Sequence, residues 1–137
     1  MALYDVFSIS GSALSAQSVR LNTVSSNLAN ADTVSSSPEQ AYRARQPVFA
    51  AVMSAIDAGR ASTGVRVAGI VESQTEIPRE YMPDHPLADR DGYVYKSNVN
   101  TVEEMANMIS ASRSYQNNIE VLNTSKQLLL KTLSLGR

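Results

Sequence analysis

The five prolines of this chain all lie in the middle of the sequence, and this placement limits the fold more than any other feature. They are Pro38, Pro47, Pro78, Pro83 and Pro86. Proline lacks a backbone N–H and its ring clashes with the preceding helical turn, so helix interiors tolerate it poorly. The two ends are therefore free to form long helices. We predict three segments: an N-terminal helix within 1–33, a middle segment over 34–100 and a C-terminal helix within 101–137.

Apolar residues of the N-terminal segment recur at spacings of three, four and seven. The stripe comprises Leu3, Phe7, Leu14, Leu21, Val24, Leu28 and Ala31, and it is interrupted at Ser10 and Gln17. Such spacings place the side chains on one face of a helix and are typical of the seam between paired helices. We expect Leu14, Leu21 and Leu28 to lie in the core of a helix pair.

The C-terminal segment shows the same pattern behind a capping signal. Thr101 and Glu104 have the spacing of a capping box, which predicts a helix start at Thr101, and Gly136 favours a stop. The stripe consists of Met105, Met108, Tyr115, Ile119, Leu122, Leu129 and Leu133, broken at Ser112 and Lys126. This helix would be about 50 Å long, whereas a compact globule of this size is about 37 Å across. We predict an elongated molecule whose terminal helices pair antiparallel in a coiled-coil-like core, with Tyr115, Ile119, Leu122 and Leu129 in that core.

The middle segment has the signals of short strands. Residues 42–49 alternate, residues 65–71 are rich in β-formers, and residues 93–95 follow the turn signal Asp91-Gly92. Residues 50–58 are also compatible with a short helical turn, and Pro83-Asp84-His85-Pro86 predicts an irregular loop. The expected fold is mainly α with a small β-rich insertion that packs outward.

Composition excludes several classes of function. The chain has 12 Lys+Arg and 13 Asp+Glu, so no net field attracts nucleic acid, and it has no cysteine for a thiolate nucleophile, a disulfide or a metal site. The longest apolar run, residues 48–53, is far too short for a membrane span, so we expect a chain that is not membrane-inserted. The first ten residues contain no basic residue, and we expect no cleaved signal peptide.

Candidate catalytic and metal-binding residues are weak. His85 is the only histidine, and the nearby acids Asp84, Asp89 and Asp91 lack the glycine and glutamate of a calcium loop. We predict no catalytic, metal or cofactor site, no small-molecule substrate, and a protein that is not an enzyme. Two alternatives remain: a small hydrolase built around His85, and a peripheral membrane adaptor that uses Leu128-Leu129-Leu130, Lys131 and Leu133.

The polar positions of the N-terminal segment carry almost no charge. Between Val6 and Ala31 the only charged residue is Arg20, and the remaining positions include Ser8, Ser12, Ser15, Ser18, Asn22, Ser25, Ser26 and Asn27. A monomer's surface normally carries about 25–35% charged residues. Small neutral polar groups cost less to bury than charges, so these faces are predicted to be interfaces with other subunits.

Two sets of motifs resemble a known family. Asn27-Leu28-Ala29-Asn30, followed by Ala31-Asp32-Thr33, resembles the N-terminal signature of bacterial flagellar axial proteins of the rod and hook. Residues 98–100, 103–105, 108–116 and 120–123, with 67–71, His85-Pro86 and 91–94, are similar to its short proximal-rod members. The residues that carry the resemblance include Asn27, Leu28, Ala29, Asn30, Glu104, Met105, Met108, Arg113, Tyr115, Gln116 and Asn123.

The resemblance implies a structural subunit of the proximal rod, the shaft that transmits torque across the periplasm from motor to hook. It also implies export through the flagellar type III apparatus and helical stacking with copies of itself, FlgB, FlgF, FlgG and FliE. A peripheral coiled-coil adaptor of a type III secretion assembly is the alternative. Asn27 and Asn30 either cap the N-terminal helix or bond across subunits, since asparagine tolerates left-handed geometry and both donates and accepts.

Overall fold

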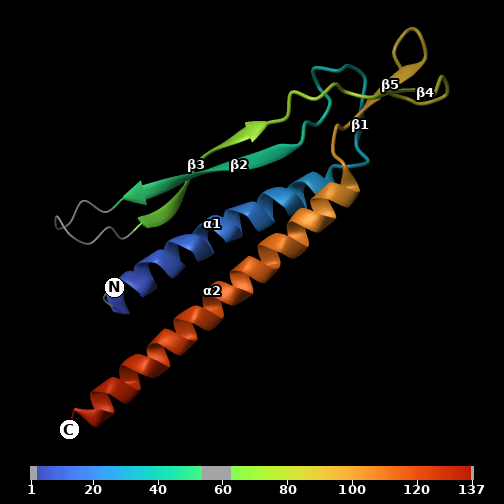
Figure 1. The fold of residues 1–137 in the computed structure, drawn as a ribbon. Helices are drawn as coiled ribbons and strands as arrows, with labels where there is room; N and C mark the ends of the chain where they lie inside the picture. Colours follow the sequence, from blue (N-terminus) through green and yellow to red (C-terminus); the bar gives the residue numbers. More distant parts are fainter. Residues whose placement is uncertain (1–2, 54–62, 137) are drawn as a thin grey trace.

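Two long helices and two small antiparallel sheets make up the structure, a computed structural model that describes residues 3–53 and 63–136. Helix α1 spans Leu3–Ala29 and helix α2 spans Thr101–Leu135. The helices lie side by side, and α2 continues beyond the N-terminal end of α1 (Figure 1). The predicted class, mainly α with a β-rich insertion, is confirmed.

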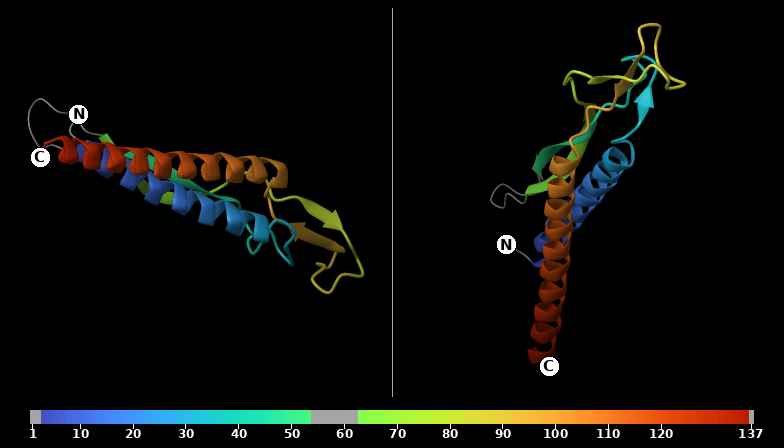
Figure 2. Two further views of the ribbon diagram at one scale, coloured as in Figure 1. Left: turned by 90° about the horizontal axis from the view of Figure 1, so that it is seen from below. Right: turned by 90° about the vertical axis from the view of Figure 1, so that its right-hand side faces the viewer.

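The insertion forms two separate β units rather than the single element expected. Strands β2 (Arg45–Met53) and β3 (Thr63–Glu72) pair as an antiparallel hairpin that packs along α1. Strands β1 (Val34–Ser35), β5 (Tyr93–Lys96) and β4 (Arg79–Tyr81) form a sheet in the order β1-β5-β4. This sheet lies past the end of the helix pair (Figures 1 and 2), so the molecule is elongated as predicted.

The strand predicted over residues 42–49 is confirmed only from Arg45, where β2 begins, and those predicted over 65–71 and 93–95 are confirmed. Pro83-Asp84-His85-Pro86 lies in a loop. The alternative of a helical turn is wrong for residues 50–53, because β2 continues there opposite β3; residues 54–58 lie outside the described part of the chain. Strand β4 was not expected, since it has only three residues and directly follows Pro78. At the turn before β5, Gly92 has φ = 81°, a conformation that favours glycine.

Helix α2 begins at Thr101 as predicted, but the predicted capping box is wrong. The cap is Asn100, whose side-chain oxygen accepts the N–H groups of Val102 at 3.1 Å and Glu103 at 3.3 Å. Glu104 does not reach back to the helix start. Its side chain turns into the interior, where it is 3% exposed and bonds to α1.

Half-buried and buried side chains of α2 follow a 3-4 repeat that differs from the predicted stripe. The repeat comprises Glu104, Met108, Ala111, Tyr115, Asn118, Leu122, Ser125 and Leu129. The prediction that Ile119 lies in the core is wrong, because its side chain is 38% exposed. Ile119 follows Asn118 by one position and therefore lies about 100° further around the helix. Leu14, Leu21 and Leu28 of α1 are half-buried. The predicted stripe contains the four apolar members Met108, Tyr115, Leu122 and Leu129 but not the small or polar members between them. Its residues Met105 and Leu133 are exposed.

Part of the uncharged polar face of α1 is covered by the chain's own insertion. The Ser12 hydroxyl accepts the Val65 N–H of β3 at 3.1 Å. The helix and the strand are close here, because a Cβ atom added to Gly64 would lie only 3.2 Å from the same oxygen. Ser26 lies 3.2 Å from the hydroxyl of Tyr42, within hydrogen-bond distance. Ser8, Ser15, Ser18, Asn22 and Ser25 are exposed. The prediction that all these polar positions face other subunits is therefore wrong for Ser12 and Ser26, and also for Asn27, which is 0% exposed and bonds within the chain.

Replacing Ala111 by leucine should destabilise the helix pair. Ala111 is 0% exposed, so the larger side chain has to push α1 and α2 apart, at a cost of about 1–3 kcal/mol in the free energy of unfolding. Denaturant unfolding followed by circular dichroism measures this loss. Ala106→Leu, at an exposed position of the same helix, is the matched control and should change stability by less than about 0.5 kcal/mol.

Candidate assembly site

A buried asparagine joins the two helices to the insertion. The Asn27 side chain is 0% exposed, and its amide nitrogen donates to the Arg45 carbonyl at 2.8 Å and to Glu104 Oε2 at 3.1 Å. Its amide oxygen accepts the Arg45 N–H at 2.9 Å and the Tyr42 hydroxyl at 3.0 Å. Both donors and both lone pairs of one side chain are thus used. The four bonds connect α1 with α2, with the first residue of β2 and with the segment before it.

Neither alternative considered for Asn27 is what the structure shows, because this side chain neither caps α1 nor faces outward. Asn30 does act as a local cap. Its side-chain nitrogen donates to the Ser26 carbonyl at 2.8 Å, and its backbone N–H donates to the same carbonyl at 3.1 Å. The sequence could not reveal the role of Asn27, since Glu104 lies 77 positions away along the chain.

Replacing Asn27 by leucine should strongly destabilise the protein. Leucine has a similar size but no hydrogen-bonding group, so the Glu104 carboxylate and the Arg45 backbone lose their partner. Each buried group left unpaired costs about 1–3 kcal/mol. Thermal and urea unfolding of Asn27→Leu measure the loss. Asn22→Leu, at an exposed position of α1, is the control; equal stability of both variants would contradict the proposed importance of these bonds.

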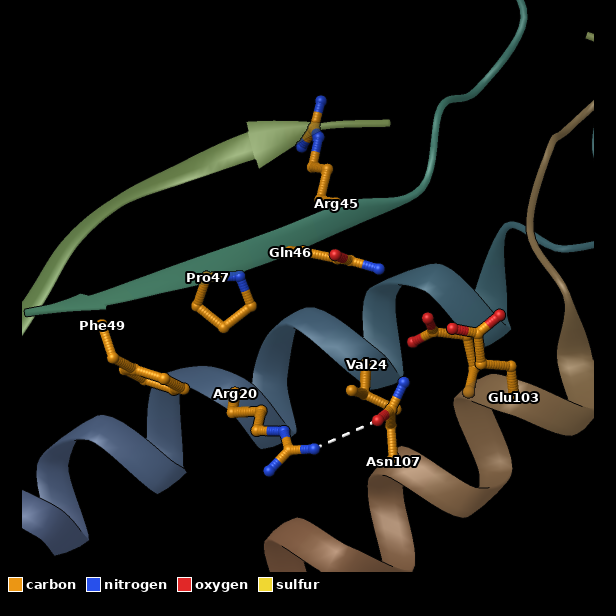
Figure 3. Close-up of a pocket in the computed structure, with 9 residues that line it drawn as sticks. Arg20, Val24, Arg45, Gln46, Pro47, Phe49, Glu103 and Asn107 are labelled. Atoms are coloured by element: carbon orange, nitrogen blue, oxygen red, sulfur yellow. Dashed lines mark hydrogen bonds between the residues drawn. The ribbon is translucent and has the colours of Figure 1, made fainter. Parts of the chain in front are cut away.

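A cleft of about 450 Å³ opens beside this bonded cluster, between β2 and the two helices. Figure 3 shows Arg20 of α1 reaching toward Asn107 of α2, and the Arg20 Nη2 to Asn107 Oδ1 distance is 3.1 Å. Phe49 and Pro47 close the cleft on the β2 side. Arg20 brings positive charge to this cleft, and Glu103 and Glu104 bring negative charge. The Arg45 side chain turns away from the cleft toward β3, where its Nη2 lies 3.3 Å from Glu72 Oε1. Its described lining contains no nucleophile and base set out for catalysis.

The loop between β4 and β5 is organised by one carboxylate. Asp89 Oδ1 accepts the N–H groups of Asp91 and Tyr93, both at 2.9 Å, and Oδ2 accepts the Tyr95 hydroxyl at 3.1 Å. The N–H of Tyr93 is the main cause that lowers the pKa of Asp89 below 3.8, and the same carboxylate raises the pKa of Tyr95. His85 belongs to this loop, where its Nδ1 accepts the Leu87 N–H at 3.1 Å. Asp89 and His85 are thus engaged in holding the turn.

Acid should release this loop, and Asp89→Asn should remove part of that response. Because the folded-state pKa of Asp89 lies below 3.8, its stabilising contribution is present above that pH and is lost as the pH falls through the folded value. The difference in melting temperature between pH 5 and pH 2 should shrink in Asp89→Asn. Asp84→Asn, an exposed residue of the same loop, should keep the wild-type difference.

The residues that carry the family resemblance divide between the interior and the surface. Asn27 and Glu104 are buried, and Leu28, Asn30, Met108 and Tyr115 are half-buried. Ala29, Met105, Arg113, Gln116 and Asn123 are exposed. Met105 is a large apolar side chain with 57% exposure, which the subunit alone does not explain. The motifs therefore combine residues that build the subunit with residues available to neighbours.

Comparison with known proteins supports the resemblance at both ends of the chain. The model of the family described as "Flagella basal body rod protein" matches residues 7–34, and that of the "Flagellar basal body rod FlgEFG protein C-terminal" matches residues 90–135. The flagellar basal-body rod protein FlgC of Salmonella typhimurium is 55% identical over 139 aligned residues, with 100% of both chains covered. The FlgC proteins of Escherichia coli O6:H1 and Yersinia enterocolitica are 54% and 53% identical, again over 100% of both chains.

The chain belongs to the FlgC family of flagellar basal-body rod proteins. It is thus a structural subunit of the rod of the flagellar basal body and serves cell motility. The FlgC family is a structural family and not a family of enzymes, so the hydrolase alternative built on His85 has no support. The alternative of a peripheral coiled-coil adaptor of a type III secretion assembly is not favoured either. Neither described helix is long and apolar enough to cross a membrane.

Proposed function

We propose that this subunit belongs to the proximal rod and stacks helically with its neighbours to transmit torque from the motor to the hook. The observation that carries the proposal is the surface of α2, a helix of 35 residues with exposed large apolar side chains from Val102 to Leu135. A helix that leaves such residues uncovered along its whole length fits a subunit whose partners complete its packing.

The two helices are proposed to act as one antiparallel, coiled-coil-like core in the rod. Two hydrogen bonds support this direction of pairing: Arg20 of α1 bonds to Asn107, and Asn27, further along α1, bonds to Glu104, further back along α2. The 3-4 repeat of half-buried and buried residues on α2 supports the coiled-coil character. Residues 1–33 and 101–137 would then form the axial core, and residues 34–100 its outer part.

Copies of this chain and the rod components FlgB, FlgF, FlgG and FliE are the proposed partners. The exposed motif residues Met105, Arg113, Gln116 and Asn123 are proposed as contacts, because they share one helix with the uncovered apolar side chains. The proposed location is the rod within the periplasm, reached through the flagellar export apparatus without a cleaved signal peptide. We infer no cofactor and no nucleic acid partner.

Leu122→Ala should impair motility. Leu122 is half-buried on the α2 repeat, and truncating a packed leucine costs about 2–5 kcal/mol. A bacterium that lacks its own FlgC protein and produces the wild-type chain should swim in soft agar, and the Leu122→Ala chain should give smaller swimming rings and fewer rods in isolated basal bodies.

Thr124, two positions after Leu122, provides the control, because it is exposed and is not one of the apolar side chains proposed as contacts. Thr124→Ala should support normal swimming. If Leu122→Ala assembled and swam as well as the wild type, the proposed seam would be wrong. Failure of the wild-type chain to restore any motility would count against the rod function itself.

A further inference from the structure

The β1-β5-β4 sheet stands apart from the rest of the subunit. In the described part of the chain, every Cα atom of these three strands lies more than 8 Å from the Cα atoms of α1, α2 and the β2-β3 hairpin. Figures 1 and 2 show the sheet beyond the end of the helix pair rather than against it. Apolar packing of the helices against the sheet therefore does not set the direction in which the sheet projects.

The sheet and the segments around it have buried residues of their own. We call residues 34–42 and 76–96 the head. Val94, in the central strand β5, is 0% exposed, and Ala41 and Ile77 are 8% exposed. Because the helices and the hairpin do not approach β5, Val94 is covered by other parts of the head. The head is thus a small packed unit that is distinct from the helix pair.

The chain passes between the head and the rest of the subunit four times, and we call these four passages the neck. They are residues 30–33, 43–44, 73–75 and 97–100. Asn98, in the last passage, accepts the Ala44 N–H on its Oδ1 at 2.7 Å. Its Nδ2 donates to the Thr75 carbonyl at 3.0 Å and to the Ser73 carbonyl at 3.5 Å. One side chain therefore joins three of the four passages.

Two other side chains of the neck join two passages each. The Ser97 hydroxyl donates to the Ala31 carbonyl of the first passage. Arg43 Nη1 donates to the Ser73 carbonyl of the third passage at 3.1 Å. Asn98 differs from both, because it bonds at the same time to the passage that enters the hairpin and to the passage that leaves it.

The two asparagines of the motif at residues 98–100 have different roles. Asn100 caps α2, as its bonds to the first turn show. Asn98 is half-buried in the neck and makes no capping bond among those described. An amide presents a donor and an acceptor in fixed geometry, so its hydrogen bonds constrain direction as well as distance.

We propose that Asn98 is a positioning residue that fixes the direction in which the head projects from the helix pair. Its loss frees the head to change direction, while the burial of Val94 and the bonds of Asn27 keep the two parts folded. The consequence for assembly rests on the proposed rod function. Stacked copies make the same contacts only if each copy holds its head in the same direction.

Distances between two spin labels, measured by pulsed electron paramagnetic resonance, test this proposal on the purified full chain, which has no natural cysteine. One label is attached at Asp84→Cys, an exposed position of the head, and one at Ala106→Cys, exposed near the start of α2. With Asn98 in place we expect a narrow distribution of distances. Adding Asn98→Ala should at least double its width, because the bonds that join three passages are lost.

Gln74→Ala is the matched control for this measurement. Gln74 also lies in the neck, but its side-chain nitrogen donates to the Glu72 carbonyl of its own segment at 3.2 Å. The width should stay that of the labelled chain with Asn98 and Gln74 intact. An unchanged width in Asn98→Ala would overturn the proposal, because the four passages alone would then hold the head. A broad distribution before Asn98 is replaced would overturn it as well.

Hydrogen exchange of the same variants separates positioning from a general loss of structure. In Asn98→Ala the amides of β5 and α1 should remain as protected as in the wild type, since each part keeps its own buried residues. Loss of protection in β5 would contradict the proposal, because Asn98 would then maintain the fold of the head rather than its direction.

Rod assembly provides the functional readout. In a bacterium that lacks its own FlgC protein, the Asn98→Ala chain should give several-fold fewer rods in isolated basal bodies, and Gln74→Ala should give normal numbers. Normal rods from an Asn98→Ala chain with a freed head would contradict the need for a fixed head. Failure of the wild-type chain to restore motility is a different result, because it would contradict the rod function and leave the distance measurement standing.

Discussion

The hydrogen bonds of Asn27 are the constraint on which the rest of the structure depends. One fully buried side chain bonds to the backbone of Arg45, to the Tyr42 hydroxyl and to Glu104. These bonds place the hairpin on α1 and fix the end of α1 against the start of α2. Because all four bonding positions are used, the site admits no other amino acid without leaving a buried group unpaired.

This arrangement explains why apolar burial is modest in so long a molecule. The fully buried large side chains among the described residues are Val94 and Asn27, and only one of them is apolar. The buried residues of the two helices include small ones such as Ala16 and Ala111, and the Ser12 hydroxyl of α1 bonds to the hairpin. Directional hydrogen bonds set the geometry of the subunit, while many of its larger apolar side chains remain exposed for contact between subunits.

Helical geometry explains why some residues of α2 face α1 and others are exposed. Residues that face α1 repeat at Glu104, Met108 and Ala111, and the exposed apolar residues Met105 and Ile109 come one position later. A shift of one residue is a rotation of about 100°, so the same helix presents one face inward and another outward. A rod subunit needs both faces, since its core has to hold the chain together while its surface binds neighbours.

The sequence by itself determined the helical ends, the β-rich middle and the family, because proline placement, apolar spacing and short motifs are local signals. It also gave the start of α2 correctly while misjudging its cap and the exposure of Ile119. Only the tertiary structure decided that Glu104 turns inward to Asn27, that Ser12 faces the hairpin, and that the insertion divides into two sheets. These features depend on contacts between residues far apart in the chain, and no local pattern encodes which distant groups will satisfy a buried donor or acceptor.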